Sequence, residues 1–149
     1  MTRELPEIKL KAIGIVRNEI KQPTRRKSKD EISEIDIDSN YTESLDNIEE
    51  FSHIIVIYWL HKSRSQAPKK VRPKGNPKHE LMGVFATRSP DRPNPIGKST
   101  VKLLERQDNV LKVEGLDAIN GTPVLDIKPY IPGYDSVEDA KAPSWMIKQ

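Results

Sequence analysis

Short strand-like segments follow one another along this chain, with hardly any helical periodicity between them. The segment SHIIVIYWL, residues 52–60, is apolar and rich in β-branched and aromatic side chains, which predicts a strand buried on both faces. The segment ISEIDID, residues 32–38, alternates isoleucine with polar residues and predicts a half-buried strand. Further strands are expected over 8–16, 81–87 and 122–132, with a hairpin over 99–118 that turns at 107–109.

Helical patterns are confined to short pieces of the chain. Residues 41–51 suit one or two helical turns with Leu45 and Ile48 facing inward, and the tail over 136–149 suits one more. Because strands outnumber helices and do not alternate with them, a doubly wound sheet is not supported. The sequence predicts an all-β protein, a single-sheeted β-barrel with short helical turns and long basic loops.

Several common kinds of site are missing from the sequence. No G-x-G-x-x-G pattern follows a first strand and no P-loop occurs, so a nucleotide-like ligand must bind by another route. The chain has no cysteine, and its three histidines show no metal-ligand spacing, so we expect neither a disulfide nor a metal. Without a membrane-length apolar run or an apolar signal core, a cytoplasmic protein that does not bind membranes is expected.

Charge is segregated along the chain behind a formal net charge of +3. Residues 30–50 hold nine acidic residues and no lysine or arginine, whereas residues 61–100 hold ten basic residues against Glu80 and Asp91. A further basic cluster spans 21–29. Basic clusters favour a polyanionic partner such as RNA. A solvated surface rich in ion pairs explains the composition equally well.

Two irregular stretches look suited to ligands. The stretch FATRSPDRPNPIGKS, residues 85–99, is stiff because its three prolines fix their own φ and push the preceding residues towards extended geometry. It therefore holds Arg88, Arg92 and Asn94 at defined positions. The basic stretch 62–80 is long for a functionless loop, so we expect a binding loop or a mobile flap there.

Three longer motifs resemble a known family. They are HIIVIYWLHK (53–62), MGVFATRSPDRPNPIGKSTVKL (82–103) and GLDAINGTPVLDIKPYIP (115–132), and they resemble the TsaA-like (TrmO-type) family of tRNA methyltransferases. The resemblance implies a β-barrel that binds S-adenosylmethionine (SAM) and works as a homodimer with SAM near the subunit boundary. It also implies N6-methylation of threonylcarbamoyl-adenosine next to the anticodon of a tRNA.

The family's bacterial members carry an additional C-terminal domain after the barrel. Here residues 1–149 are expected to form a single TsaA-like barrel domain with no additional C-terminal domain. Since that domain could assist tRNA binding, the RNA substrate stays open, whereas the motifs that carry the cofactor site are present.

The resemblance implies a cofactor site built from several loops and strand ends. By their match to the family's motifs, the expected SAM contacts are Pro23, Thr24, Arg25, His61, Lys62, Arg88, Lys98, Ser99, Glu114, Gly115, Leu116 and Asp117. The planar donors of Arg88 suit a carboxylate or an adenosine edge. Simpler roles are open too: Arg88 as a loop anchor, His61 as a structural histidine and Asp117 as a turn cap.

The reaction that the resemblance implies needs a general base. Methyl transfer from a sulfonium is an in-line displacement that needs alignment and exclusion of water. The nitrogen of a carbamoyl-adenosine is a poor nucleophile because its lone pair is delocalised, so a base is expected to remove its proton. Asp117 and Asp126 are the candidates, and the sequence does not choose between them.

RNA contacts are expected in three places. Arg92 and Asn94 either reach the substrate or fix the proline-rich loop by local hydrogen bonds. Lys128 and Tyr130 share a strand face with the second candidate base, either in solvent or as a wall where a base stacks on the tyrosine. The long basic stretch adds possible phosphate contacts at Lys69, Lys70, Arg72 and Lys74.

Other function classes remain open at this point. One is a non-catalytic SAM-binding or RNA-binding barrel, and another is a methyltransferase of a different RNA or of a small molecule. Turnover of SAM separates an enzyme from a binding protein. Loss of activity on removing the basic loop charges separates an RNA substrate from a small one.

Overall fold

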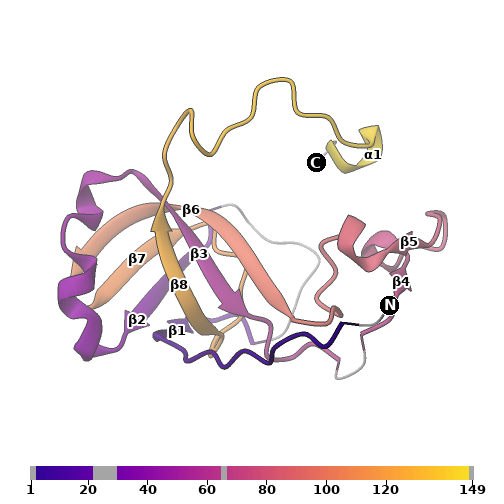
Figure 1. The fold of residues 1–149 in the computed structure, drawn as a ribbon. Helices are drawn as coiled ribbons and strands as arrows, with labels where there is room; N and C mark the ends of the chain where they lie inside the picture. Colours follow the sequence, from indigo (N-terminus) through magenta and orange to yellow (C-terminus); the bar gives the residue numbers. More distant parts are fainter. Residues whose placement is uncertain (1–2, 22–29, 65–66, 148–149) are drawn as a thin grey trace.

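Six strands close into one antiparallel barrel in the computed structural model, which describes residues 3–21, 30–64 and 67–147 (Figure 1). Around the barrel the order is β1-β2-β7-β6-β3-β8. The predicted all-β barrel is therefore confirmed. The strands are β1 (Gly14–Arg17), β2 (Ile32–Ile37), β3 (His53–Trp59), β6 (Ile96–Gln107), β7 (Val110–Glu114) and β8 (Pro123–Pro129).

Alternate side chains of the strands fill the barrel interior. On β2, Ser33, Ile35 and Ile37 are buried while Ile32 and Glu34 face solvent, as the alternating sequence predicts. Each fully buried aliphatic side chain contributes about 1.5–3 kcal/mol relative to an exposed one. The other strands supply the rest of the interior, namely Val16, Ile54, Val56, Tyr58, Val101, Leu111, Val113 and Val124.

Like every strand of the barrel, β3 is paired along both edges, and its ladder with β6 is the longest in the barrel. It pairs with β6 from His53 opposite Lys102 to Trp59 opposite Ile96, and its other edge pairs with β8. The register shifts once between β6 and β7 and once between β3 and β8, at Leu104 and Leu125. Such extra residues bend and twist a strand, which helps a small sheet to close.

Arg106 fastens two helical turns to one end of the barrel. These turns are η1 (Ser39–Leu45) and η2 (Ile48–Glu50), both 3-10 helices. The guanidinium, 13% exposed, donates to the carbonyls of Thr42 and Leu45, each at 3.2 Å, and to Glu49 Oε1 at 3.1 Å. Hydrogen bonds from the backbone and from Arg106 lower the pKa of Glu49. The predicted helical turns, with Leu45 inward, are present.

Residues 67–87 form a small flap outside the barrel. It contains β4 (Lys70–Val71), η3 (Pro73–Gly75), β5 (Met82–Gly83) and η4 (Val84–Ala86), with β4 and β5 paired. The chain after β8 runs back over this flap and ends in α1 (Ser144–Ile147), as Figure 1 shows. There the Trp145 ring stacks on His79 with centroids 4.5 Å apart.

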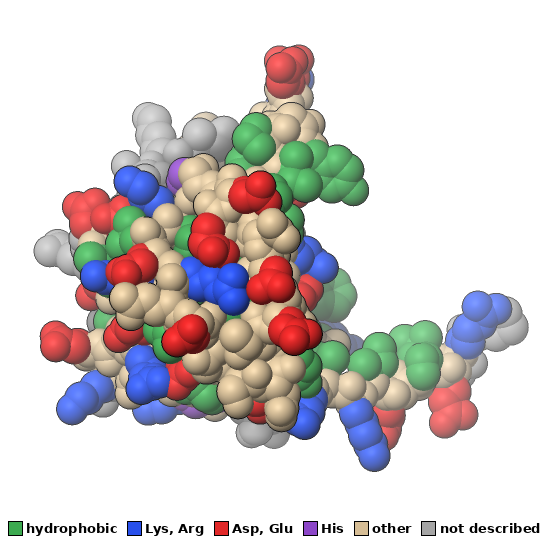
Figure 2. Space-filling model, turned by 90° about the vertical axis from the view of Figure 1, so that its left-hand side faces the viewer, with side chains coloured by type: hydrophobic (Ala, Val, Ile, Leu, Met, Phe, Trp, Pro, Cys, Tyr) green, Lys and Arg blue, Asp and Glu red, His purple; other side chains and the backbone are tan. Residues whose placement is uncertain are grey.

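The charge segregation seen along the sequence is also a segregation in space. The turns η1 and η2 lie at one end of the barrel and the flap lies at the opposite end (Figure 1). Figure 2 looks at the first end, and many acidic side chains face the viewer there. A polyanion would therefore meet the acidic residues of 39–50 at one end and the basic flap at the other.

Several predicted boundaries are wrong, including those of the first strand, of the strand over 81–87 and of the hairpin over 99–118. The first strand begins at Gly14 rather than at residue 8, and just before it only Ile13, among the described residues 3–13, has backbone hydrogen bonds to the barrel: its amide donates to the Val124 carbonyl and its carbonyl accepts from the Asp38 amide, each at 2.8 Å. The strand expected over 81–87 shrinks to Met82–Gly83, because its partner β4 has only two residues and the chain then turns into η4. β6 begins at Ile96 rather than at residue 99, where the predicted hairpin begins. Ile96 follows the last proline of the proline-rich stretch directly, and Trp59 is its pairing partner.

Arg106→Lys is expected to lower the free energy of unfolding by about 2 kcal/mol, because one ammonium cannot donate to all these acceptors at once. Denaturant unfolding followed by circular dichroism measures the change. Arg17→Lys is the matched control, since Arg17 is exposed and pairs with Asp36 alone among the described ion pairs. Its expected effect is below about 0.5 kcal/mol. Equal losses in the two variants would contradict the role of Arg106.

Candidate functional site

A cavity of about 610 Å³ opens at the end of the barrel where β3 ends and β6 begins. We call it the proline-loop cavity, because the proline-rich stretch forms one side. The turn after β3 and the segment before β8 form the others. Its lining residues are Tyr58, Leu60, His61, Lys62, Ser63, Arg64, Arg88, Pro90, Asp91, Arg92, Ile96, Gly97, Lys98, Asp117, Ala118, Ile119 and Thr122.

Hydrogen bonds tie two of these walls together. The Leu60 amide donates to the Pro95 carbonyl at 2.7 Å, which continues the β3–β6 pairing by one residue. The Arg64 amide donates to Asp91 Oδ1 at 2.9 Å, and its guanidinium lies 3.6 Å from the other carboxylate oxygen. The turn after β3 is thus held against the proline-rich loop on two sides.

Arg92 gives the proline-rich loop its internal order. Its Nη1 donates to the carbonyls of Thr87 and Ser89, each at 3.0 Å. The Ser89 amide donates to Thr87 Oγ1 and the Asp91 amide to Ser89 Oγ, each at 3.2 Å. Arg92 therefore performs the loop-fixing role, although it also lines the cavity. Arg88, by contrast, is exposed at the cavity and carries a guanidinium suited to a ligand.

Tyr58 lies at the buried side of the cavity. Its ring is 3% exposed, and its hydroxyl lies 2.8 Å from both Ser99 Oγ and the Asp117 carbonyl. Burial raises the pKa of Tyr58, while the bond to Ser99 and the charge of Arg88 act in the opposite direction. The sequence patterns do not identify Tyr58 as a site residue. The available signal was a hydroxyl in an otherwise apolar strand, which needs a polar partner when buried.

The cavity combines a cationic rim with an apolar interior. Five Lys and Arg side chains line it against two carboxylates, and one of these, Asp91, is paired with Arg64. A ligand with a carboxylate or phosphate is therefore attracted to the rim. A flat, weakly polar part of the same ligand can lie on the apolar lining, formed by Leu60, Pro90, Ile96, Ala118 and Ile119.

The cavity brings together five of the expected cofactor residues: His61, Lys62, Arg88, Lys98 and Asp117. The others lie elsewhere. Ser99 and Leu116 are buried, Ser99 with its hydroxyl bonded to Tyr58 and Leu116 in the barrel core. Glu114 ends β7 opposite Lys102, and Gly115 donates its amide to the Glu31 carbonyl at 2.9 Å. Pro23, Thr24 and Arg25 lie outside the described residues.

The two candidate bases occupy different places. Asp117 lines the cavity, whereas Asp126 lies on β8 outside its lining. The Asp126 carboxylate accepts a 2.8 Å bond from Lys128 Nζ, and this bond raises the pKa of Lys128. The two side chains thus share a face, as the strand alternation predicts. Tyr130 stands edge-on to His53, with ring centroids 6.5 Å apart.

The candidate RNA contacts on the flap are exposed. The Val84 amide donates to the Lys69 carbonyl at 3.0 Å, which closes the base of the flap four residues before Arg88. Asn94 is exposed on the proline-rich loop. The other candidate RNA contacts of the flap, Lys70, Arg72 and Lys74, are also exposed.

Neither a metal cluster nor a membrane-spanning helix is present in the part of the chain that the structure describes. Within it, no group of three or more His, Cys, Asp or Glu side chains is arranged to hold a metal ion. No helix in the same residues has the length and apolar character needed to cross a membrane.

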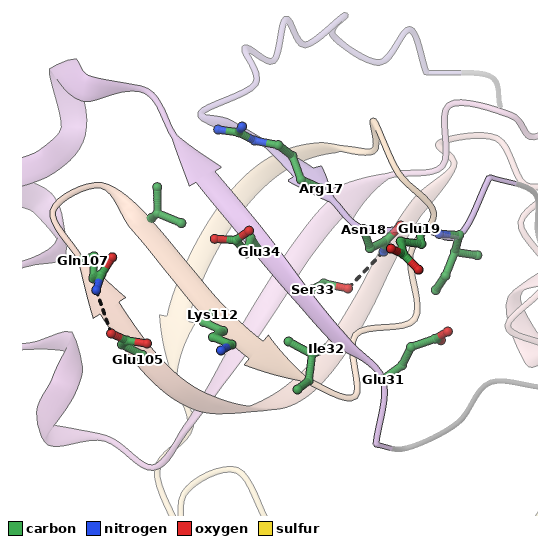
Figure 3. A pocket seen from close by; sticks show the side chains of 12 residues that line it. Arg17, Asn18, Glu19, Glu31, Ile32, Ser33, Glu34, Glu105, Gln107 and Lys112 are labelled. Carbon is green, nitrogen blue, oxygen red and sulfur yellow. Dashed lines mark hydrogen bonds between the residues drawn. The ribbon is translucent and has the colours of Figure 1, made fainter.

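A second cavity, of about 620 Å³, lies across the outer wall of the barrel (Figure 3). Six charged residues line it, and four of them form a row over four neighbouring strands, in which Arg17 is opposite Glu34, Glu34 opposite Lys112 and Lys112 opposite Glu105. Directly opposed unlike charges stabilise a sheet. Because these charges have cross-strand neighbours of opposite sign, this groove makes a weaker case for a charged ligand than the proline-loop cavity.

Comparison with known proteins identifies the family. The profile of the family described as tRNA-methyltransferase O N-terminal domain matches residues 16–136. The chain belongs to this family. The resemblance read from its three motifs is therefore confirmed. The crystal structure of TrmO from P. aeruginosa has the same fold, with a TM-score of 0.78 and 30% identity over 95% of this chain and 63% of that one.

The relatives include proteins named for SAM binding and an enzyme named for tRNA methylation. An S-adenosyl-L-methionine-binding protein of Archaeoglobus fulgidus is 46% identical over 132 residues, which cover 86% of this chain and 93% of that protein. The tRNA (adenine(37)-N6)-methyltransferase of Escherichia coli is 42% identical over 108 residues, 69% of this chain and 46% of that enzyme. The chain also matches another A. fulgidus relative, of which it spans only 37%.

Proposed function

We propose that this chain is a SAM-dependent tRNA methyltransferase that binds SAM in the proline-loop cavity. The target we propose is N6 of threonylcarbamoyl-adenosine next to the anticodon. The observation that carries the proposal is the convergence of His61, Lys62, Arg88, Lys98 and Asp117 on one cavity in a member of this family. These residues come from three separate segments of the chain, and the barrel brings them together.

The lining fits SAM in size and chemistry. Its volume of about 610 Å³ lies within the usual range for small-molecule sites, about 300–1,000 Å³. Arg88 would hold the carboxylate through its paired donors, and the apolar lining around Ile96 and Ile119 would take the adenine. The cationic rim suits the carboxylate, and Asp117 offers the one carboxylate on the lining that Arg64 does not hold.

Asp117 is the better candidate for the base. When bound, SAM supplies an electrophilic methyl group, and the protein has to align the acceptor nitrogen and take its proton. Asp117 lines the cavity, so it can reach an acceptor beside the cofactor. Asp126 lies on β8 outside this lining. We therefore assign proton removal to Asp117.

The flap and the loops around it are proposed to hold the RNA. Anticodon-loop bases can be splayed out and read by stacking, which suits Tyr130, while Asn94 and Lys128 are polar groups for the bases or the backbone. The exposed flap cations would track phosphates. This assignment explains why cations line the cavity and why the basic flap lies at the end of the barrel opposite η1 and η2, whose positions Figure 1 shows.

A non-catalytic SAM-binding protein is the second candidate function. The observation that favours it is the name of the archaeal relative that matches almost full length, which states SAM binding alone. A methyltransferase of another RNA or of a small molecule is the third. Cofactor turnover and RNA dependence distinguish the three.

We also propose a homodimer that works in the cytoplasm. Large apolar side chains are exposed on the segments before β1 and after β8, including Leu5 at 76%, Ile8 at 77% and Tyr134 at 82%. Figure 2 shows hydrophobic side chains on parts that project from the body of the barrel. Projecting apolar surface of this kind marks a contact with a partner, and a second copy is the one we infer.

Titration calorimetry with SAM tests the cofactor site. Wild-type protein is expected to bind saturably, and Arg88→Ala to bind at least about tenfold more weakly, because a charge-assisted bond to the carboxylate is lost. Arg17→Ala, in the second cavity, is the control and is expected to bind like wild type. If folded wild-type protein bound no SAM, the cofactor assignment would be wrong.

Replacing Lys69, Lys70, Arg72 and Lys74 with glutamine tests the RNA assignment. Methylation of tRNA is expected to fall steeply and its salt dependence to flatten, because up to four phosphate contacts are lost, while SAM affinity stays unchanged. Lys102→Gln with Lys112→Gln removes charge from the barrel wall as a control. Full activity of the flap variant on tRNA would favour a small substrate instead.

Sedimentation equilibrium tests the dimer. The expected mass is twice the 17.0 kDa of one chain, and replacing Leu5 and Ile8 with serine is expected to weaken association because apolar contact area is lost. Ile32→Ser changes an exposed isoleucine on β2 and is the matched control. A wild-type protein that stays monomeric at high concentration would refute this part of the proposal.

A further inference from the structure

Tyr58 and Ser99 form a buried polar pair directly behind the proline-loop cavity. They lie on neighbouring strands, β3 and β6, and are 3% and 8% exposed. The Tyr58 hydroxyl lies 2.8 Å from Ser99 Oγ and 2.8 Å from the Asp117 carbonyl oxygen. The Asp117 amide donates to Ser99 Oγ at 3.3 Å. Three groups are therefore connected by three hydrogen bonds.

The donors and acceptors in this group can be assigned without ambiguity. The Asp117 carbonyl can only accept, so the single proton of Tyr58 goes to it. The Asp117 amide can only donate, so Ser99 Oγ accepts there. Ser99 must then donate its own proton to the Tyr58 oxygen. The bonds run in one direction from the Asp117 amide through Ser99 and Tyr58 to the Asp117 carbonyl, a chain in which each hydroxyl bond polarises the next.

These hydrogen bonds engage both backbone polar groups of Asp117, its amide and its carbonyl. The residue lies in a segment between β7 and β8 with no ladder partners at this point, so its amide and carbonyl depend on these side chains. On either side, Leu116 and Ala118 are buried at 2% and 4% exposure. The backbone of Asp117 is thus fixed from two directions, and its side chain leaves from a fixed point on the cavity wall.

Gly97 shows that the tyrosine ring is closely fitted to this place. It lies opposite Tyr58 in the β3–β6 register, and a Cβ at position 97 would lie 2.5 Å from Tyr58 Cε2. Any larger residue would push the ring away from the β6 backbone. The glycine therefore allows the ring to lie flat, which brings its hydroxyl within reach of Ser99 and Asp117.

We propose that Tyr58 and Ser99 are positioning residues that aim the Asp117 carboxylate at the acceptor nitrogen, and that Ser99, which is outside the cavity lining, does not touch the cofactor. This inference rests on the proposed methyl transfer and on Asp117 as its base. It changes the role of Ser99, which the family resemblance assigned to cofactor contact. Burial keeps the pKa of Tyr58 above its usual value, so the hydroxyl remains a donor through neutral pH.

Tyr58→Phe tests the inference, because it removes the hydroxyl and leaves the ring against Gly97. The expected result is a loss of about tenfold in kcat for tRNA methylation with little change in KM for SAM, as for a group that acts through the base. In an Asp117→Asn background the same change is expected to cost nothing more, because the residue it aims has lost its function. Tyr41→Phe, on η1 at the other end of the barrel, is the matched control.

Hydrogen exchange gives a readout that does not depend on activity. The Asp117 amide is expected to exchange faster in Tyr58→Phe and in Ser99→Ala than in wild type, with the core amides of β3 unchanged. Ser99→Ala also serves if Tyr58→Phe fails to fold. Unchanged exchange at Asp117 or unchanged kcat in folded variants overturns the inference. If wild-type protein has a protected Asp117 amide but transfers no methyl group, the proposed function is wrong, whereas the hydrogen bonds among Tyr58, Ser99 and Asp117 are still supported.

Discussion

The whole structure depends on the pairing of β3 along both of its edges. β6 is bonded to one edge and β8 to the other, and the pairing of β8 with β1 then closes the sheet, so none of the six barrel strands leaves an edge open. An open sheet edge would expose unpaired amides and carbonyls and invite association. The same pairing sets the position of the site, because the chain leaves β3 at Trp59 and enters the cavity wall directly.

The site is stiff for two separate reasons. Three prolines restrict the backbone of the loop before β6, and Arg92 then ties the carbonyls of Thr87 and Ser89 to one guanidinium. On the opposite wall, side chains from two strands hold the Asp117 backbone. A site whose walls are already ordered loses little conformational entropy when a ligand binds. The barrel thus offers preformed walls to a ligand, with the flap beside them.

Charge gives the molecule two distinct ends. Acidic residues cluster around η1 and η2, where Arg106 donates to several carbonyls and to Glu49. Basic residues cluster on the flap and around the proline-loop cavity at the opposite end. Between them, the barrel wall carries the alternating row that includes Glu34 and Lys112, whose charges oppose one another. A polyanion approaching this molecule is therefore attracted to the cavity end and repelled by the other.

Local periodicity made much of the fold predictable from the sequence. The alternating isoleucines of 32–37 and the apolar run of 53–59 correctly located β2 and β3, since burial on one or two faces leaves a signal within a few residues. The motif match also named His61, Arg88 and Asp117 before the cavity was known. Family membership followed from the same motifs, because they are long and unusual in composition.

Only the tertiary structure decided which of the matched side chains face the cavity. That Ser99 is buried behind Asp117 and that Asp126 lies outside the lining both depend on strand register. Register is set between residues some forty or more positions apart, such as Tyr58 and Ser99, and a bulge at Leu125 shifts it by one residue. The sequence alone therefore determined the strands and the family, and the closing of the barrel decided which side chains line the cavity.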